Sequence, residues 1–580
     1  MTRIGIVGCG TMGSGIAAAA ARAGHDVVIR VKDDAHAQEG RERIAASLAG
    51  TTREHPEIEE ELDRVAFVTE LGGLADRELI VEAIPEDIEA KRSVFAKLGE
   101  AAGEEAVLAT NTSSLPVIEL ATASGAPERV VGLHFFNPPP VMELVELAET
   151  VATAPEVRDR ARAFVASLGK TPVVCRDRAG FIANLLLFPY LNEAVKLLDA
   201  GYAGREQIDT AMRLGAGHPM GPLQLADLIG LDAVTQVLES LHAQWSDARY
   251  APSPSLRHLV TAGFTGRKAG RGFYTYAAPG SAATIPDGRE ATAPLTAEPI
   301  EVRVVGVAGT GAVGAGIAEV AAGAGYDVIV WGRAIDSLDR GRAAVERGAG
   351  RAVDKGRLSE GDRDALLGRI AWTTDLTDLG AADLVVEAVA EDLALKERLF
   401  AELGKVAAEH AVLATATSSL PVVDLAAASG RLDRVVGLHV FNPVSAMRLV
   451  EVVHTVASSP ESLATATAVA QRMGKTCVPC GDRAGFIVNR LLFPYLNDAI
   501  RMLEDGYASA EDIDVAMTLG ANHPVGPLAL ADLVGLDVAL EILRALHREH
   551  REPSFAPAPL LEQMVRAGFL GRKSGRGLGA

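Results

Sequence analysis

Hydrophobic residues follow two different patterns along the chain. Over residues 1–183, short runs rich in valine, isoleucine and leucine, such as RIGIVG, DVVIR, LIVEAI and VLATNT, alternate with alanine-rich stretches of helical period. This alternation predicts a parallel β-sheet covered by helices. From Asn184 the apolar positions keep a helical spacing, as in IANLLLFPYLNEAVKLLDAGY. The pattern therefore predicts an α/β domain followed by an all-α domain.

The same succession occurs a second time. Ile4–Ala17 (IGIVGCGTMGSGIA) matches Val305–Ala318 (VGVAGTGAVGAGIA), and the run DRAGFIANLLLFPYLNEA from Asp177 matches DRAGFIVNRLLFPYLNDA from Asp482. The offsets of 301 and 305 residues indicate a tandem duplication. We predict two copies of a Rossmann-type dinucleotide-binding domain followed by a helical domain, joined by a linker rich in Pro, Ala and Thr. The expected units are residues 1–183, 184–277, 278–301 (the linker), 302–488 and 489–580.

Composition limits the classes of function. The 580-residue chain has a net charge of −20, which disfavours nucleic acid or an anionic membrane as its main partner. No apolar run in the sequence approaches the roughly 18 residues of a membrane span. A predicted strand begins at Arg3 and leaves no room for a signal peptide, so we expect a cytoplasmic protein. Four cysteines, including one CVPC pair, predict neither a disulfide framework nor a metal site.

Each predicted α/β domain opens with a glycine-rich turn. The pattern GxGxxG follows a strand and begins an alanine-rich helix in both copies. Glycines at these positions let the backbone approach a pyrophosphate, whose charge the helix N-terminus stabilises. We therefore predict that a dinucleotide binds at Gly8, Gly10 and Gly13 and at Gly309, Gly311 and Gly314.

The end of the second strand bears on the choice between NAD and NADP. An acidic residue at this point accepts hydrogen bonds from the adenosine ribose in NAD-binding folds. The first copy instead has Val31 and Lys32, and the second has Gly332 and Arg333. A basic side chain there can pair with a 2′-phosphate. The sequence favours NADP for the second copy and leaves NAD and NADP open for the first.

A histidine and a glutamate keep a separation of twelve residues in both copies. They are His134 and Glu146 in the first copy and His439 and Glu451 in the second. Three residues before each glutamate the copies carry opposite charges, so charge is not retained at that neighbouring position. A histidine oriented by a carboxylate is a suitable general base beside a nicotinamide. Removal of a hydroxyl proton while hydride leaves the same carbon is alcohol oxidation, and the reverse is ketone reduction.

An ordered series of motifs runs through the chain. It comprises GxGxMGxGIA, TNTSSLP, GLHFFNPP, ELVE, AGFIANLLL, HPMGPLxLADLIGLD and GRKAGRGFYTY, most of them present in both copies with small changes. With this series the chain resembles the L-3-hydroxyacyl-CoA dehydrogenase family, which includes 3-hydroxybutyryl-CoA dehydrogenases, over nearly its whole length.

The resemblance implies roles for individual residues. His134 resembles the family's acid/base, and Glu146 resembles the carboxylate that orients it. Ser113 would hydrogen-bond the reacting oxygen, and Asn184 would hold the substrate near its thioester carbonyl. Glu86 and Lys91 would contact the cofactor. The second-copy equivalents of these residues, in the same order, are His439, Glu451, Ser418, Asn489, Glu391 and Lys396. The second copy also keeps a basic segment, RAVDKGRLSE, in which Lys355 would contact the CoA phosphate, whereas the first copy has the acidic GTTREHPEIEE.

We therefore expect an enzyme that interconverts an L-3-hydroxyacyl-CoA and a 3-oxoacyl-CoA with NAD or NADP. The helical domain is the family's dimerisation surface, so the resemblance implies that the two helical domains pair within the chain as a pseudo-dimer; further homo-oligomerisation stays open. Two alternatives also stay open. One is a sugar-acid or other 3-hydroxy-acid dehydrogenase on the same scaffold, and the other is one catalytic half with a binding or structural second half. The sequence leaves the acyl chain length and the biological direction undecided.

Overall fold

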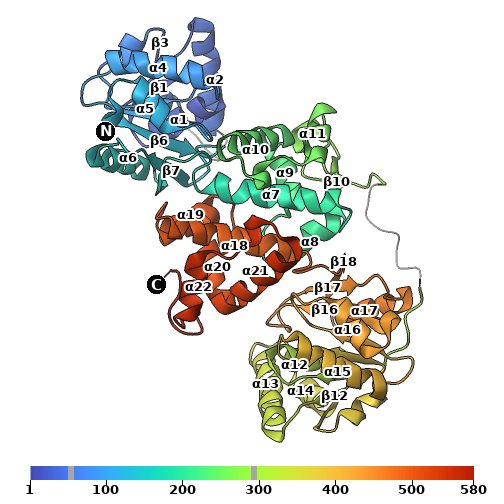
Figure 1. Cartoon of the computed structure of the whole chain (residues 1–580). Helices are drawn as coiled ribbons and strands as arrows, with labels where there is room; N and C mark the ends of the chain where they lie inside the picture. The colour runs from blue at the N-terminus through green and yellow to red at the C-terminus, as the bar shows by residue number, and fades with distance from the viewer. Residues whose placement is uncertain (1, 50–57, 289–296, 580) are drawn as a thin grey trace.

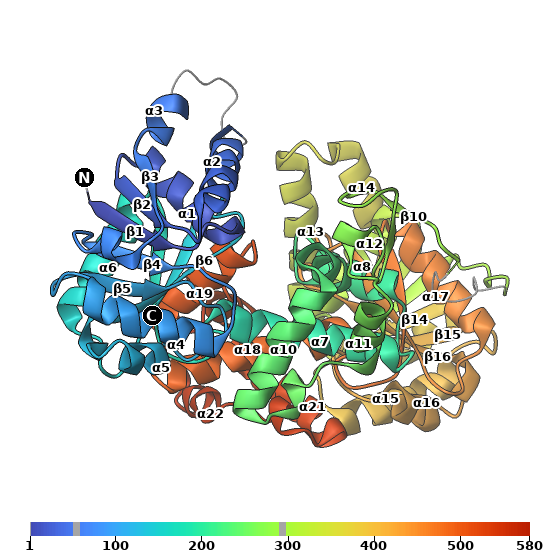
Figure 2. The same cartoon turned by 90° about the horizontal axis from the view of Figure 1, so that it is seen from above.

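The computed structural model describes residues 2–49, 58–288 and 297–579. Two α/β domains lie at opposite ends of the molecule, and the two helical domains lie between them (Figure 1). Seen from above, the α/β domains stand on either side of the paired helices (Figure 2). The predicted fold class, a tandem duplication of a Rossmann-type domain and a helical domain, is confirmed.

The first sheet has eight strands in the order β3-β2-β1-β4-β5-β6-β7-β8. Neighbouring strands run parallel except β6 and β7, which run antiparallel. The strand order reverses between β1 and β4, and the crevice at their carboxyl ends is where such folds hold a dinucleotide. The strands are β1 Arg3–Val7, β2 Asp26–Arg30, β3 Val65–Val68, β4 Leu79–Glu82, β5 Val107–Thr110, β6 Val130–Phe135, β7 Leu144–Glu149 and β8 Thr171–Arg176.

Helices cover both faces of this sheet and form two apolar layers. On one face, Ile16, Ile44 and Phe164 belong to a core confined to this domain. On the other face, Phe95 and Leu120 belong to a core that continues into the helical domains. The helices are α1 Thr11–Arg22, α2 Asp34–Ala49, α3 Ile58–Leu62, α4 Ile88–Ala101, α5 Val117–Ala123 and α6 Pro155–Ser167.

The second α/β domain repeats this arrangement, with the strand order β13-β12-β11-β14-β15-β16-β17-β18. Its antiparallel pair is β16 and β17. The strands are β11 Val304–Ala308, β12 Asp327–Trp331, β13 Ile370–Thr373, β14 Leu384–Glu387, β15 Val412–Thr415, β16 Val435–Val440, β17 Leu449–His454 and β18 Thr476–Gly481. The helices are α12 Ala312–Gly323, α13 Ile335–Asp354, α14 Glu360–Gly368, α15 Leu393–Val406, α16 Val422–Ser429 and α17 Pro460–Arg472.

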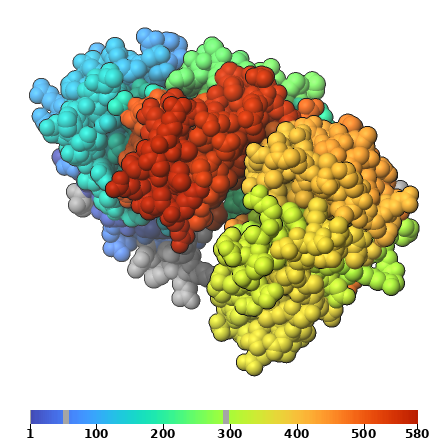
Figure 3. Space-filling view, turned by 60° about the horizontal axis from the view of Figure 1, so that its bottom comes forward, coloured from blue at the N-terminus to red at the C-terminus, as the bar shows by residue number. Residues whose placement is uncertain are grey.

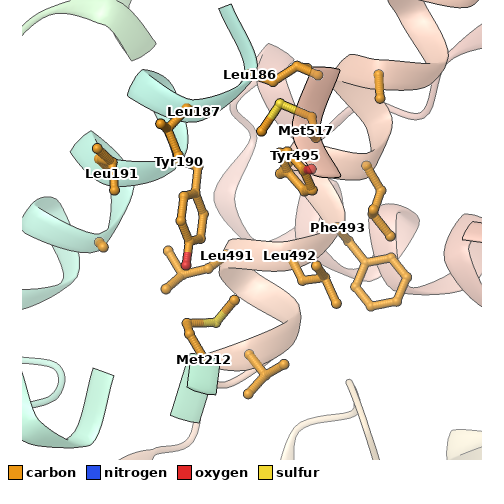
Figure 4. Close-up of a cluster of buried hydrophobic side chains, with 14 of the residues drawn as sticks. Leu186, Leu187, Tyr190, Leu191, Met212, Leu491, Leu492, Phe493, Tyr495 and Met517 are labelled. Atoms are coloured by element: carbon orange, nitrogen blue, oxygen red, sulfur yellow. The ribbon is translucent and has the colours of Figure 1, made fainter. Parts of the chain in front are cut away.

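Each helical domain begins with a long helix, and the two long helices pack against each other. In α7 (Ala183–Asp199), 13 of 17 residues are buried, as expected for a helix that is apolar on all sides. Tyr190 of α7 and Tyr495 of α18 (Val488–Glu504) lie in one apolar cluster with Met212 (Figure 4). The two helical domains therefore share a core that neither would close alone.

The remaining helices surround this pair. They are α8 Arg205–Gly215, α9 Pro222–Ile229, α10 Leu231–Trp245 and α11 Pro254–Thr261 in the first copy, and α19 Ala510–Gly520, α20 Pro527–Val534, α21 Leu536–His550 and α22 Pro559–Arg566 in the second. Over the described part of the chain, every helix is too short or too polar to cross a lipid bilayer.

The segment expected to be a linker, residues 278–301, is partly structured. β10 (Thr284–Ile285) pairs antiparallel with β9 (Thr275–Tyr276). Asp287 then forms an ion pair with the buried guanidinium of Arg205 at 2.8 Å. A two-residue strand has no period, so the sequence pattern carried no sign of this pairing. Residues 289–296 of the segment lie outside the described residues.

Candidate active site

The glycine-rich turns use their glycines for two different purposes. Gly8 has φ +103°, and a Cβ there would lie 2.7 Å from the carbonyl oxygen of Ala83. A Cβ at Gly13 would lie 2.1 Å from the carbonyl oxygen of Gly8. Packing of the protein itself therefore requires these two glycines. A Cβ at Gly10 would meet nothing within 4 Å, so the open space beside Gly10 fits a phosphate group at the N-terminus of α1.

The second turn repeats this division. Cβ atoms at Gly309 and Gly314 would collide with backbone oxygens at 2.4 and 2.2 Å, whereas the space beside Gly311 is open to 4 Å. A bound dinucleotide would account for a glycine at Gly10 and Gly311, where the protein's own packing does not require one.

His134 and Glu146 lie directly opposite each other in the antiparallel pair of β6 and β7. Their twelve-residue separation is the register of this pair, and directly opposed residues point to the same face. Nδ1 of His134 lies 2.7 Å from Oε2 of Glu146. His439 and Glu451 are opposed in the same way at 2.6 Å. Because Nδ1 is bonded to the carboxylate, Nε2 is the nitrogen available for proton transfer.

Backbone N–H groups at the start of a long helix donate hydrogen bonds to the glutamate of each pair. Glu146 is fully buried, and its Oε1 accepts hydrogen bonds from the backbone N–H groups of Ile182 at 3.0 Å and Ala183 at 2.7 Å. Two N–H groups at the start of α18 hold Glu451 at 2.9 Å each. A helix N-terminus favours negative charge. The ionised carboxylate therefore accepts a hydrogen bond from the Nδ1–H group of the imidazole, which leaves Nε2 unprotonated in the neutral ring.

Aromatic rings that the sequence patterns did not single out enclose each imidazole. The ring centroid of His134 lies 4.6 Å from that of Phe136 and 5.7 Å from that of Phe181. Phe181 has φ +47°, a left-handed conformation that is costly for a bulky side chain. Phe486, beside His439, has φ +50°. In both copies, therefore, a phenylalanine in this strained conformation lies just before the long helix and packs against the histidine.

The loop after β5 brings Ser113 to the same region. Oε1 of Glu86 accepts hydrogen bonds from the Thr112 hydroxyl at 2.5 Å and from the Ser113 backbone N–H at 3.0 Å. The side-chain amide of Asn184 donates to the carbonyl oxygen of Ser113 at 3.4 Å. The same kinds of contact in the second copy join Thr417, Ser418, Glu391 and Asn489.

A buried ion pair at the end of β4 supports Glu86. Nζ of Lys91 lies 2.8 Å from Glu82 and 3.3 Å from Glu86, and the lysine is fully buried. Burial by itself raises the pKa of Glu86, but the charge of Lys91 and the hydrogen bond from Thr112 bring the pKa below its ordinary value. Lys91 is thus buried beside Glu86 and stabilises its carboxylate; the direct cofactor contact that the family resemblance implies for Lys91 stays a prediction.

Glu82 and its equivalent Glu387 were missed by the sequence reasoning. Lys396 pairs with Glu387 at 2.7 Å and with Glu391 at 3.2 Å, as in the first copy. The signal was present, because VEAIPE and VEAVAE keep both glutamates at the same separation. A carboxylate at the end of a buried strand requires a partner, and the lysine nine residues later supplies it.

One cavity in the first copy joins the glycine-rich turn to the histidine. Its volume is about 1020 Å³. The predicted site residues that line it are Gly8, Gly10, Lys32, Glu86, Ser113, His134 and Asn184. Residues whose roles were inferred from separate motifs, spread over more than 170 positions, therefore border a single space.

The corresponding cavity of the second copy, about 950 Å³, has a different border. Four residues of α21, Asp537, Val538, Glu541 and Ile542, lie along it. Neither His439 nor Asn489 is among the described residues that line it. The predicted site residues on its wall are Gly309, Gly311, Arg333, Glu391, Lys396 and Ser418.

The adenosine ends of the two cavities also differ. In the first copy Arg30, Lys32, His36 and Arg43 border the cavity, and Arg43 donates to the carbonyl oxygen of Cys9 at 3.0 Å. In the second copy the lining is Trp331, Gly332, Arg333 and Ser337. Lys355 is exposed just after α13 and is not among the described residues that line this cavity. Much of the acidic first-copy counterpart of the Lys355 segment lies outside the described residues.

Comparison with known proteins agrees with the geometry. The family model for the 3-hydroxyacyl-CoA dehydrogenase NAD binding domain matches residues 3–178 and 304–483, and the model for the C-terminal domain matches 180–276 and 485–580. A 3-hydroxyadipyl-CoA dehydrogenase of Escherichia coli is 32% identical over 97% of this chain and 96% of its own length.

Two further relatives cover one or both copies. A 3-hydroxybutyryl-CoA dehydrogenase of Mycobacterium tuberculosis is 48% identical over 48% of this chain and 97% of its own length. The crystal structure of a 3-hydroxybutyryl-CoA dehydrogenase from Escherichia coli superimposes with a TM-score of 0.71 at 29% identity, covering 98% of this chain and 99% of that one. The resemblance inferred from the motifs is thereby confirmed: the chain belongs to the 3-hydroxyacyl-CoA dehydrogenase family and carries both of its domains twice.

Proposed function

We propose that this chain interconverts an L-3-hydroxyacyl-CoA and a 3-oxoacyl-CoA with an NAD(P) cofactor, using the residues that border the first-copy cavity and their second-copy equivalents. The observation that carries the proposal is that one cavity joins the dinucleotide-type turn at Gly10 to the buried pair of His134 and Glu146. An alcohol dehydrogenase needs these two features within reach of one carbon atom. The names of the relatives supply the acyl-CoA part of the substrate.

The residues would share the chemistry as follows. The nicotinamide, when bound, supplies or accepts the hydride at C3. In the direction of oxidation, Nε2 of His134 accepts the hydroxyl proton, and Glu146 stabilises the imidazolium through Nδ1. Ser113 donates a hydrogen bond to the reacting oxygen, and Asn184 holds the substrate near its thioester carbonyl. In the direction of reduction, the imidazolium returns the proton to the same oxygen.

The experiment that tests this function follows nicotinamide absorbance while the purified protein reduces acetoacetyl-CoA, with NADH and NADPH at matched concentrations. Turnover with either cofactor supports the proposal. Acetoacetate without CoA is the matched control, because it keeps the ketone and removes the CoA contacts. Turnover of free 3-hydroxy acids, together with no turnover of the CoA ester, would contradict the proposal and favour the sugar-acid alternative.

A second substrate deserves the same assay. The Escherichia coli relative that spans both copies acts, by its name, on 3-hydroxyadipyl-CoA. Oxidation of 3-hydroxyadipyl-CoA is therefore measured beside that of 3-hydroxybutyryl-CoA. A higher kcat/KM for the longer, carboxylated acyl group would place this chain's substrate class with that relative.

Exchange of Glu146 for glutamine is expected to lower the first-copy kcat by roughly 100-fold, because general acid–base catalysis contributes about 10²–10⁴-fold. The glutamine carbonyl keeps the hydrogen bonds from Ile182 and Ala183, so the fold is retained. Its NH₂ group faces Nδ1 and forces the proton onto Nε2, which can then no longer accept one. The assay is acetoacetyl-CoA reduction and its reverse in a His439→Asn background. Unchanged oxidation in Glu146→Gln would contradict the role of the carboxylate.

The second copy is proposed to prefer NADP. Arg333 lines the adenosine end of its cavity, where a 2′-phosphate would lie. In a His134→Asn background, Arg333→Ala is expected to raise the KM for NADPH about 10-fold or more, since a charge-assisted hydrogen bond contributes about 1.5–3 kcal/mol. The KM for NADH is expected to stay unchanged. Lys32→Ala in a His439→Asn background is the matched variant of the first copy, and equal effects on both cofactors would refute the phosphate contact.

The paired helical domains are proposed to act as a covalent pseudo-dimer. Arg490 of α18 contacts Glu193 of α7 at 2.6 Å, and Arg249 of the first copy contacts Asp498 of the second at 2.5 Å. The acids of these two ion pairs, Glu193 and Asp498, are equivalent positions of the two copies, but the arginines are not, because Leu185 stands where the second copy has Arg490. The contacts support a specific pairing of the two unlike halves. The linker raises the effective concentration of one half near the other.

A further inference from the structure

In each helical domain, one helix ends against the other copy. Figure 3 shows the second helical domain, in red, lying against the cyan segments of the first copy. Gly520 is the last residue of α19 and packs closely against the first copy. A Cβ at Gly520 would lie 2.9 Å from a methyl carbon of Leu144, 3.6 Å from Cβ of Ala183 and 3.7 Å from the ring of Phe136.

All three contacted residues adjoin the first-copy histidine and glutamate. Leu144 begins β7, two residues before Glu146. The backbone N–H of Ala183 donates to Glu146 at 2.7 Å. The ring of Phe136 packs on His134 at 4.6 Å between centroids. The end of α19 therefore touches the strand, the helix start and the aromatic ring that together fix the two side chains.

The same relation holds in the reverse direction. Gly215 is the last residue of α8, and a Cβ there would lie 2.9 Å from Leu449 and 2.7 Å from Val488 of the second copy. Leu449 begins β17, and the backbone N–H of Val488 donates to Glu451 at 2.9 Å. Both glycines are needed for close approach, because a larger side chain would push on the support of the carboxylate.

Hydrogen bonds between the copies fix the position of these helix ends. The backbone N–H of Arg176, at the end of β8, donates to the carbonyl oxygen of Tyr507 at 3.1 Å. The hydroxyl of Tyr202 donates to the carbonyl oxygen of Gly481, at the end of β18, at 2.7 Å. The loop before each of the two helices is thus tied to the edge strand of the opposite sheet.

We propose that Gly520 and Gly215 are positioning residues for the histidine–glutamate pair of the opposite half. This inference rests on the proposed catalytic role of those pairs. Each site is then completed by the helical domain of the other copy, and neither half keeps its geometry without its partner. A shift of about 1 Å in a catalytic group can lower a rate about 100-fold, so a contact without any chemistry of its own can still control turnover.

The experiment uses the full chain in two backgrounds. His439→Asn leaves the first-copy site to turn over acetoacetyl-CoA, and His134→Asn leaves the second. Gly520→Val is expected to lower kcat about 10–100-fold in the first background and to leave kcat unchanged in the second. Gly215→Val is expected to give the reverse. KM for acetoacetyl-CoA should change little, because the substrate contacts are not moved.

Conservative variants separate positioning from general loss of structure. Gly520→Ala adds one methyl group against the end of the Leu144 side chain, which can rotate away, and should restore most of the activity. The pH profile of kcat in Gly520→Val should also shift, because the contact of His134 with Glu146 is altered. Equal losses at both sites, or a loss confined to the variant's own half, would overturn the proposal.

A readout without turnover distinguishes failure of this inference from failure of the proposed function. The Nδ1 proton of His134, shared with Glu146 at 2.7 Å, should give a downfield proton resonance, assigned by its disappearance in His134→Phe. Gly520→Val should move this resonance and leave that of His439 in place. If the wild-type protein reduces no acyl-CoA and the resonance moves as expected, the function is wrong and the positioning holds. If the His134 resonance stays fixed, the positioning is wrong.

Discussion

Exchange of both His134 and His439 for asparagine is expected to lower acetoacetyl-CoA reduction at least 1000-fold, at the upper part of the roughly 10²–10⁴-fold that general acid–base catalysis contributes. Asparagine keeps an N–H donor near the position of Nδ1, so the buried Glu146 and Glu451 retain a partner. It has no group at the position of Nε2. The loss would therefore measure proton transfer and not an unpaired buried carboxylate.

The two single variants show how the halves divide the activity. His134→Asn and His439→Asn are assayed beside the double variant, with cofactor binding followed by nicotinamide fluorescence. Loss of about half the turnover in each single variant means two working sites. Loss of nearly all turnover in one of them means one catalytic half, which is the alternative that the sequence left open. Retention of more than a tenth of the activity in the double variant would contradict the role of histidine in both copies.

The interface between the halves is expected to weaken below about pH 6.5. His218 and His523 stack across it with ring centroids 4.0 Å apart, and each Nδ1 is bonded to a tyrosine hydroxyl, that of Tyr190 or Tyr495. Burial lowers the pKa of His218 to about 3, with a further contribution from His523, and lowers the pKa of His523 to about 4. Both rings therefore stay neutral in the folded protein, where two charged rings in contact would repel each other.

The sign of the pH effect follows from these pKa values. Unfolded histidine has a pKa of about 6.5, so below that pH the unfolded chain binds protons that the folded chain does not. This contribution to stability is intact above about pH 6.5 and is lost as the pH falls toward the folded values. With about 1.4 kcal/mol per pH unit and histidine, acidification from pH 6.5 to 4.5 would cost roughly 5 kcal/mol.

The measurement compares urea unfolding of the wild type with that of His218→Phe/His523→Phe between pH 7.5 and 4.5. Phenylalanine keeps the stacked rings and removes the titration, at the cost of two hydrogen bonds to tyrosine. The variant should be less stable at pH 7.5 and should lose less stability on acidification, so the two curves should approach or cross. The difference between the curves is needed because burial raises the pKa of Asp209 to about 7, which acts in the opposite direction. Parallel curves would contradict the role of the histidine pair.

Local and repeated features of this protein were determined by the sequence alone. The alternation of short apolar runs with alanine-rich segments predicted the Rossmann-type domains, and the offsets near 300 predicted the duplication. The spacing of His134 and Glu146 predicted the pair that the antiparallel strands then bring to 2.7 Å. Such features are accessible because strand period, glycine turns and the register of neighbouring strands depend on residues close in the chain.

Long-range contacts were decided by the tertiary structure. Both copies keep Lys91 or its equivalent nine residues after a glutamate, but the sequence does not show that the charge of Lys91 is fully buried, because the cost of burying an ion depends on what surrounds it. The strain at Phe181 and the stacking of His218 on His523 likewise depend on where the two long helices meet. Gly520 stands 376 positions from Leu144 and yet contacts it. Periodicity shows which face of a helix or strand is apolar, but it does not show which element packs on that face. The packing of the two unlike halves decides this, and only that packing brings the ends of α8 and α19 against the site of the other half.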